Sequence, residues 1–179
     1  MLYLASKSPR RRSILKTAKI PFKGINSDFI ETKSIDDPYK RAEYNAIGKA
    51  CNTDQKTGTI LSIDTLGYFD DTILEKPKDK NDAFRMLSLL SNNTHSVISC
   101  SCFYFPKTKN KKVFLTETKV TFFKLTNDEI CNYIDTNNVL DKAASYGIQD
   151  DAKMFVKNIE GDYWNIIGLP MAVLRHCKK

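Results

Sequence analysis

The residues with the clearest chemical potential lie near the N-terminus, in the segment SKSPRRR at positions 6–12. Ser8 and Pro9 are typical of a helix N-cap and a first helical position, which predicts Arg10 and Arg11 in the first turn. Because the helix dipole is positive there, it disfavours each arginine by roughly 0.3–1 kcal/mol. The backbone N–H groups, serine hydroxyls and guanidinium groups of this turn could together bind a phosphate. The alternative is a solvated basic turn that begins an ordinary helix.

Asp64 is the main candidate for a catalytic carboxylate. It follows the mostly apolar run ILSI at positions 60–63, and this pattern predicts a buried strand that ends at the aspartate. Enzymes with α/β folds present functional groups at such strand ends. A charged group there needs a partner, such as a metal, a lysine or a water that it polarises. Alternatively, Asp64 is a turn residue that opens a hairpin.

Two lysines are candidates for contacts with an anion. Lys49 lies about 20° from Ala42 on a predicted helix with about 100° per residue, at the edge of its apolar stripe. From there its side chain either extends into solvent or reaches an anion in a cleft. Lys76 precedes Pro77, whose ring fixes the local backbone, so we expect the lysine to be held in place.

Gln149 is a candidate for recognition of a nucleobase. It ends the segment DKAASYGIQ at positions 141–149, in which small residues surround an aromatic one and allow a close backbone approach. Its amide both donates and accepts hydrogen bonds, as recognition of a base edge requires. A packed loop without a binding role is the alternative.

The composition limits the class of protein. With 179 residues, 41% of them hydrophobic and 27% charged, the chain is expected to form one soluble globular domain over positions 1–179. No apolar run approaches the roughly 20 residues of a membrane span, and no signal-peptide core is evident. The odd number of five cysteines, widely spaced, predicts reduced thiols, so we expect a cytoplasmic protein without a membrane partner.

The net charge of +7 favours a polyanionic partner, such as a nucleotide, a nucleic acid or a membrane surface. A lysine-rich surface is an equally good explanation for the lysines at positions 107–112 and 178–179. The two histidines lack partners at catalytic or metal-ligand spacing. P-loop, Rossmann and α/β-hydrolase readings are disfavoured because none of their glycine motifs is present.

The order of predicted elements is that of an α/β fold with both parallel and antiparallel pairing. Strands or extended segments are expected at residues 2–5, 22–26, 59–64, 66–69, 72–74, 96–105, 112–125 and 154–159. Helices are expected at residues 9–19, 38–52, 80–90 and 127–135, with a last helix from Pro170. Asp37-Pro38 is expected as the N-cap and first position of the second helix, and Thr126 with Glu129 as a capping box that opens the fourth. Asp70-Asp71 is the expected turn of a hairpin between residues 66–69 and 72–74.

These motifs, taken in order over the whole chain, resemble those of the Maf-like nucleoside triphosphate pyrophosphatases. The matching segments are LASKSPRR (4–11), KA (49–50), DT (64–65), LEKP (74–77), S…HSV (91–97), DKA (141–143), YGIQ (146–149), IEG (159–161) and GLP (168–170). The resemblance implies an inosine-triphosphatase-like fold, a single α/β domain whose mixed, twisted sheet is flanked by helices and has a substrate cleft. It also implies a divalent metal cofactor, Mg²⁺ or Mn²⁺, and hydrolysis of a nucleoside triphosphate to the monophosphate and pyrophosphate.

The resemblance also implies roles for individual residues. Asp64 is similar to the catalytic proton acceptor, and with Glu31 it is a candidate metal ligand. The expected triphosphate contacts are Ser6, Arg10, Arg11, Lys49 and Lys76. The positions expected to select the substrate are Arg10, Thr65 and Gln149.

One subgroup of the family shares the Asp-Thr, Glu-Lys-Pro and Tyr-Gly-Ile-Gln motifs and prefers dTTP and UTP, including modified uridine triphosphates. This chain is similar to that subgroup, although it departs from the family pattern at three places. Ser62-Ile63 replaces Gly-Ala, and Ala144 replaces a glycine. Asp150-Asp151-Ala152 replaces the glycines after the glutamine, which predicts lost access to positive φ and two negative charges that repel substrate or recruit another metal.

The rival function is a nucleic-acid-binding protein without enzymatic activity, or a regulator of cell division. It predicts an affinity that falls steeply with salt, but no RRM, KH or helix-turn-helix signature supports it. House-cleaning of other non-standard triphosphates is a second rival. The family often forms dimers, so a homodimer is expected by analogy alone.

Overall fold

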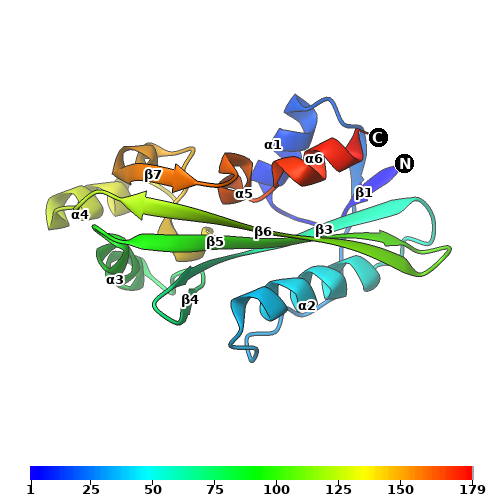
Figure 1. The fold of residues 1–179 in the computed structure, drawn as a ribbon, viewed down its shortest axis with the longest axis horizontal. Helices are drawn as coiled ribbons and strands as arrows, with labels where there is room; N and C mark the ends of the chain where they lie inside the picture. Colours follow the sequence, from blue (N-terminus) through cyan, green and yellow to red (C-terminus); the bar gives the residue numbers. More distant parts are fainter. Residues whose placement is uncertain (179) are drawn as a thin grey trace. The chain divides into compact units, whose positions relative to one another are not determined.

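The computed structural model describes residues 1–178, and Lys179 of the basic C-terminal tail lies outside the described residues. A seven-stranded mixed sheet has the order β2-β1-β3-β5-β6-β7, with β4 paired to β3 (Figure 1), so the predicted α/β class is confirmed. The strands are β1 (Leu2–Leu4), β2 (Phe22–Gly24), β3 (Thr59–Phe69), β4 (Thr72–Leu74), β5 (Thr94–Phe105), β6 (Asn110–Phe122) and β7 (Val156–Glu160). The helices are α1 (Pro9–Thr17), α2 (Pro38–Cys51), α3 (Lys80–Leu90), α4 (Asn127–Thr136), α5 (Tyr163–Ile167) and α6 (Met171–Cys177), with short 3₁₀ turns η1 (Ala143–Ser145) and η2 (Asp151–Phe155).

The chain divides into two compact units. Unit 1 contains Met1–Thr65, Ser99–Thr116 and Gly168–Lys179, and unit 2 contains Leu66–Ile98 and Glu117–Ile167. Strands β3, β5 and β6 therefore contribute residues to both units. That the chain forms one domain over residues 1–179 stays a prediction.

Unit 1 is built on a parallel core, in which β1 pairs with β2 on one side and with β3 on the other. Helix α1 begins at the N-cap Ser8 and α2 at the N-cap Asp37, and each has a proline at the first position, as predicted. Helix α2 packs on β3, since the hydroxyl of Ser62 donates to the carbonyl of Ala46. A glycine at position 62 could not make this bond, so the departure from the family pattern is used in packing.

The prediction that a strand ends at Asp64 is wrong. Strand β3 continues to Phe69 because its distal half pairs with β4, from Gly67 opposite Leu74 to Phe69 opposite Thr72. The strand that does end nearby is β1, whose last residue Leu4 pairs with Leu61. Asp64 therefore lies in the middle of its own strand but beyond the carboxyl end of a parallel neighbour, the position where α/β sheets present ligand-binding groups.

Unit 2 contains the hairpin of β3 and β4, the antiparallel pair of β6 and β7, and helices α3 to α5. Asp70 and Asp71 have φ of 47° and 55°, which is the left-handed geometry that a two-residue hairpin turn requires. Helix α3 has the predicted bounds, and α4 has the predicted capping box of Thr126 and Glu129. Helix α5 was not predicted, because its five residues are too few to show a helical period.

Two further features of the chain concern its surroundings. All five cysteines are free thiols. Within residues 1–178 the helices are all too short or too polar to cross a membrane.

Candidate active site

Asp64 lies at the centre of a cluster of charged side chains in unit 1. Lys49 extends from α2, and its Nζ is 2.6 Å from Oδ1 of Asp64 and 3.1 Å from Oε1 of Glu31. The side chains of Asp64 and Lys49 are only 7% and 12% exposed, whereas that of Glu31 is 57% exposed. Lys49 therefore reaches an anion, which was one of the two predicted alternatives, and that anion is the candidate catalytic carboxylate.

Asn45 holds the segment that carries Glu31 against helix α2. Its Oδ1 accepts from the backbone N–H of Thr32 at 2.9 Å, and its Nδ2 lies 3.3 Å from the Thr32 carbonyl and 3.5 Å from Oδ2 of Asp64. The sequence analysis missed Asn45. A signal was available, because Asn45 precedes Lys49 by four residues and so lies on the same helical face.

Arg11 forms the second positive part of the cluster. Its guanidinium donates to the carbonyl of Gly168 at 2.8 Å, to Oγ of Ser6 at 3.1 Å and to Oγ1 of Thr65 at 3.0 Å. Burial, the largest effect, and the charge of Arg10 lower the pKa of Arg11 to about 10, although the carboxylates of Asp64 and Glu31 raise it. Arg11 thus stays protonated at neutral pH. Because its three acceptors are neutral oxygens, its charge is available to an anion.

Strand geometry explains how β3 serves both parts of the cluster. Successive side chains of a strand point to opposite faces, and Asp64 meets Lys49 of α2 whereas Thr65 meets Arg11 of α1. The hydroxyl of Thr65 also shares a hydrogen bond with that of Ser99, at 2.9 Å, which fixes its position. The adjacent residues Asp64 and Thr65 thereby bring the ion pair with Lys49 and the guanidinium of Arg11 to the same point of β3.

Asp64 and Glu31 also fit a divalent cation. Their oxygens converge on one cationic nitrogen, and carboxylate oxygens are the donors that Mg²⁺ and Mn²⁺ prefer. No group of three or more His, Cys, Asp or Glu side chains within residues 1–178 is arranged to hold a metal. Two carboxylates are consistent with the usual coordination of Mg²⁺, which commonly binds one or two carboxylates and completes its shell with water and substrate phosphates.

The remaining predicted site residues fall into two groups. Ser6 and Arg10 belong to unit 1, with Ser6 bound to Arg11 and Arg10 half-buried in the first turn of α1. Lys76 and Gln149 belong to unit 2, and their part in the site stays a prediction. The side chain of Lys76 is exposed and Pro77 is buried, and the expectation that the proline holds the lysine in place stays a prediction.

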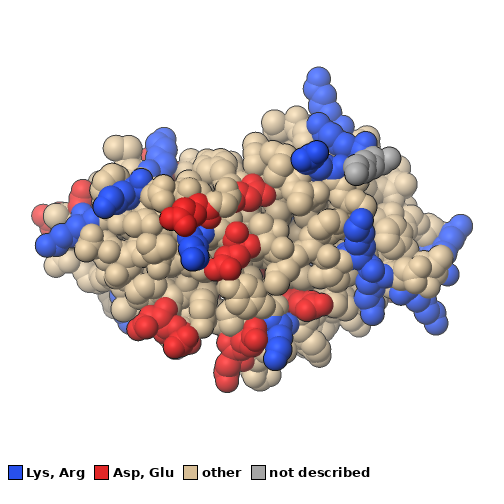
Figure 2. Space-filling view, viewed as in Figure 1, with Lys and Arg blue, Asp and Glu red and all other residues tan. Residues whose placement is uncertain are grey.

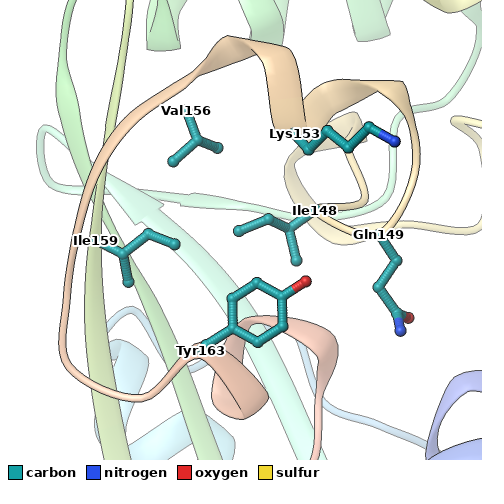
Figure 3. A pocket seen from close by; sticks show the side chains of 6 residues that line it. All are labelled: Ile148, Gln149, Lys153, Val156, Ile159 and Tyr163. Carbon is teal, nitrogen blue, oxygen red and sulfur yellow. The ribbon is translucent and has the colours of Figure 1, made fainter.

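Gln149 borders a pocket in unit 2 of about 450 Å³ (Figure 3). In Figure 3 the side chain of Ile148 lies between those of Ile159 and Gln149, and the ring of Tyr163 lies below it. The complete lining consists of Ile148, Gln149, Lys153, Val156, Ile159 and Tyr163. An apolar floor with an aromatic ring, an amide and an ammonium group has the chemistry of a site for a flat, polar-edged ligand.

The glycine replacements have different consequences in the structure. Ala144 has φ of 55°, so an L-residue occupies left-handed backbone at a position where the family has glycine. Asp150 has φ of −92°, and Asp151 and Ala152 also lack positive φ, so the expected loss of access to such conformations has no effect there. Asp150 forms an ion pair with Lys142, at 3.0 Å, and Asp151 accepts from Asn137.

The positive charge of the chain is concentrated in one unit. Unit 1 has 19 Lys and Arg against 7 Asp and Glu, which gives +12, and unit 2 has 9 against 14, which gives −5. In Figure 2, blue side chains gather over α1 and over the turn between β5 and β6, both of which belong to unit 1. The unit that contains Arg11 and Lys49 is therefore the one suited to a polyanion.

Comparison with known proteins agrees with this geometry. A family model described as "Maf-like protein" matches residues 1–178. A "dTTP/UTP pyrophosphatase" of Thermosipho africanus is 42% identical over 172 residues, which cover 96% of this chain and 88% of that protein. Proteins of the same name from Geobacillus sp. WCH70 and Clostridium botulinum strain Hall are 39% and 41% identical, over 96% and 95% of this chain and 92% and 91% of their own lengths. With matches over nearly its whole length, the chain belongs to the Maf-like protein family.

Proposed function

We propose that this protein hydrolyses dTTP and UTP to the nucleoside monophosphate and pyrophosphate. The observation that carries the proposal is the cluster of Asp64, Lys49 and Arg11, a nearly buried carboxylate with two cations. The relatives at about 40% identity that are named dTTP/UTP pyrophosphatases support the choice of substrate. The five free thiols suit a reducing compartment, so we place the reaction in the cytosol.

Hydrolysis at the α-phosphorus requires that the negative charge of the triphosphate is neutralised and that a water is oriented in line. Arg11 supplies a preorganised fork of donors, since its orientation is fixed by Gly168, Ser6 and Thr65 before substrate binds. Lys49 supplies a second charge. Arg10 and the exposed Lys76 are further contacts of the phosphate chain in this proposal.

Asp64 orients the attacking water and accepts its proton. A carboxylate held by Lys49 and by the amide of Asn45 keeps one orientation, which is what in-line attack demands. When Lys49 turns to the phosphates, the amide of Asn45 still holds Oδ2 of Asp64, and Oδ1 becomes accessible to water.

We further propose that Asp64 and Glu31 hold a divalent cation when the substrate is bound. Such an ion supplies Lewis-acid stabilisation of the charge on the phosphate oxygens. Arg10, Thr65 and Gln149 select the pyrimidine nucleotide in this proposal. Gln149 has the pattern of donor and acceptor that a uracil or thymine edge complements.

A panel of nucleotides tests the proposal. Purified protein is incubated with each of the common and modified triphosphates, with Mg²⁺, with Mn²⁺ or with EDTA, and pyrophosphate is measured. We expect release from dTTP and UTP that EDTA abolishes. Release of inorganic phosphate, or turnover of purine triphosphates alone, would contradict the proposal. Protein that releases no pyrophosphate but binds single-stranded DNA with a steep salt dependence would favour the nucleic-acid-binding alternative.

A further inference from the structure

We propose that Lys142 and Asp150 form a brace that positions Gln149 for the nucleoside. The inference rests on the proposed function, because it gives Gln149 a ligand, and it adds two positioning residues outside the phosphate cluster. Both residues and all of their contacts described below lie in unit 2.

Lys142 is a nearly buried cation with a fixed set of partners. Its side chain is 8% exposed, and its Nζ lies 3.0 Å from Oδ2 of Asp150 and 3.4 Å from Oδ1 of Asp141. The same ammonium donates to the carbonyl of Asn138. The side chains of Asp150 and Asp141 are 33% and 42% exposed, so solvent screens these pairs in part, but the buried ammonium itself keeps three fixed acceptors.

The ion pair joins the two ends of the loop at residues 142–150. Lys142 and Asp150 flank Gly147, where a Cβ atom would lie 2.7 Å from the Asp150 carboxylate and 2.9 Å from Cε of Lys142. A Cβ atom here would have to displace one of these two side chains, so the glycine leaves room for the ion pair and does not serve a positive φ angle. Two hydrogen bonds from backbone N–H groups hold the same loop, since the N–H of Asp150 donates to the Gly147 carbonyl at 3.0 Å and that of Gly147 to Oη of Tyr133 at 3.1 Å.

Gln149 is the exposed residue of this closed loop. Its neighbours Ile148 and Asp150 are buried and half-buried, so its backbone is fixed on both sides while its side chain remains accessible. Gln149 and Ile148 form part of the wall of the pocket in Figure 3. The brace thus acts on the residue and on the pocket wall that would meet a base.

The ion pair depends on the aspartate at position 150, where this chain departs from the family pattern. The family pattern has glycine here, and a glycine could not form the ion pair. The carboxylate of Asp150, for which repulsion of substrate or recruitment of a metal was expected, forms an ion pair with Lys142. The loop therefore has a salt bridge at the position where the family pattern has a conformationally free glycine.

Asp150→Asn tests the brace, with Asp151→Asn as the matched control. Both variants remove one negative charge from adjacent positions, but Asp151 is bound to the amide of Asn137 rather than to Lys142. Asp150→Asn should fold, because Asp141 still balances Lys142. We expect KM for dTTP and UTP to rise about fivefold to tenfold with little change in kcat, the loss that one misplaced hydrogen bond causes.

Hydrogen exchange provides a readout that does not depend on turnover. In Asp150→Asn the amides of Gly147 and Asp150 should exchange faster than in the wild-type protein, and Asp150→Glu should restore both their protection and KM. Unchanged exchange in Asp150→Asn, an equal effect of Asp151→Asn, or a loss of kcat at constant KM would overturn the inference. If the wild-type protein released no pyrophosphate from dTTP or UTP, the proposed function would fail instead, and the exchange measurement would still decide whether the brace exists.

Discussion

The candidate site residues of the two units are held in place in different ways. In unit 1 most candidate side chains are half-buried or buried and are bound to one another, as Lys49 is to Asp64 and Arg11 is to Thr65, although Glu31 is exposed. In unit 2 the candidate residues Lys76 and Gln149 are exposed, and the order lies in the backbone that carries Gln149. The formal charges of +12 and −5 follow the same division.

Under the proposed function, this difference matches the two kinds of recognition that a nucleoside triphosphate needs. A triphosphate carries the same charges whatever its base, so a fixed set of cations can bind it and electrostatic preorganisation is the main requirement. A base must be distinguished by a few hydrogen bonds. This requires an accessible amide on a backbone with a fixed position, and net charge matters less. Substitutions of Asp64 and Arg11 in unit 1 should therefore affect all substrates equally, and substitution of Gln149 in unit 2 should affect the choice between them.

The largest effect is expected from Asp64→Asn. The amide cannot accept the proton of the attacking water, so pyrophosphate release should fall by about 10²–10⁴-fold for every nucleotide. The fold should persist, because Glu31 still pairs with Lys49. Circular dichroism checks the fold, and Asp54→Asn, at an exposed aspartate of the same unit, serves as the control. Turnover near the wild-type rate in Asp64→Asn would remove the residue from the mechanism.

Arg11→Lys should have the next largest effect. A lysine cannot reproduce the planar fork that binds Gly168, Ser6 and Thr65, and it presents one point charge to the phosphates. We expect kcat/KM to fall by about 10–100-fold, as for the loss of one or two charge-assisted hydrogen bonds. The factor should be the same for dTTP, UTP and any other triphosphate that the protein accepts.

Arg12→Lys is the matched control for Arg11→Lys. Arg12 is exposed, and its guanidinium makes a long hydrogen bond of 3.4 Å to the Ser6 carbonyl. Its replacement should leave kcat/KM unchanged. An Arg11→Lys effect that differs between bases would contradict the assignment of this residue to the phosphate end.

Local sequence signals predicted a large part of this fold. The caps at Ser8, Asp37 and Thr126 were all correct, because a cap is decided by side-chain and backbone chemistry within four residues. The end of the strand at Asp64 was not predictable in this way, because the strand continues through its pairing with β4. The exposed aspartates at positions 70 and 71 were nevertheless recognised as the turn.

The candidate site was likewise predictable only where local sequence signals decide the structure. The position of Lys49 on its helix predicted that it could reach an anion, but the identity of that anion required the pairing of α2 with β3. The three acceptors of Arg11 lie 5, 54 and 157 residues away, and only the tertiary fold brings Gly168 to it. The partner of Asp150 was missed as well, since no pattern indicates that Lys142 crosses Gly147.

Gln149→Ala should change substrate choice and leave the chemistry intact. Loss of one well-placed hydrogen bond to the base should lower kcat/KM for dTTP and UTP by about tenfold or less. The poorer substrates should change little, so the ratio of kcat/KM between good and poor nucleotides should shrink. Gln55→Ala, at the half-buried glutamine of unit 1, should leave that ratio unchanged. An equal loss for every nucleotide in Gln149→Ala would erase the proposed division between the units.

The smallest effect concerns stability and separates the two histidines of the chain, one in each unit. His95 of unit 2 is buried, donates or accepts through Nε2 at 2.8 Å from Oη of Tyr146, and has its pKa lowered by burial to about 4. A histidine in the unfolded chain titrates near 6.5, so the unfolded state binds more protons below that pH. The stability that His95 contributes is complete above pH 6.5 and is lost as the pH falls toward 4.

Between pH 8 and pH 6 the free energy of unfolding should therefore fall by about 1 kcal/mol through His95. Urea denaturation followed by the fluorescence of Trp164, the single tryptophan and a residue of unit 2, measures this loss. His95→Gln should remove the dependence, because an amide does not titrate, whereas His176→Gln in unit 1 should retain it. If His95→Gln kept the wild-type slope, the acid sensitivity of unit 2 would have to come from another group, and the neutral, buried state of His95 would not be what stabilises the fold around Tyr146.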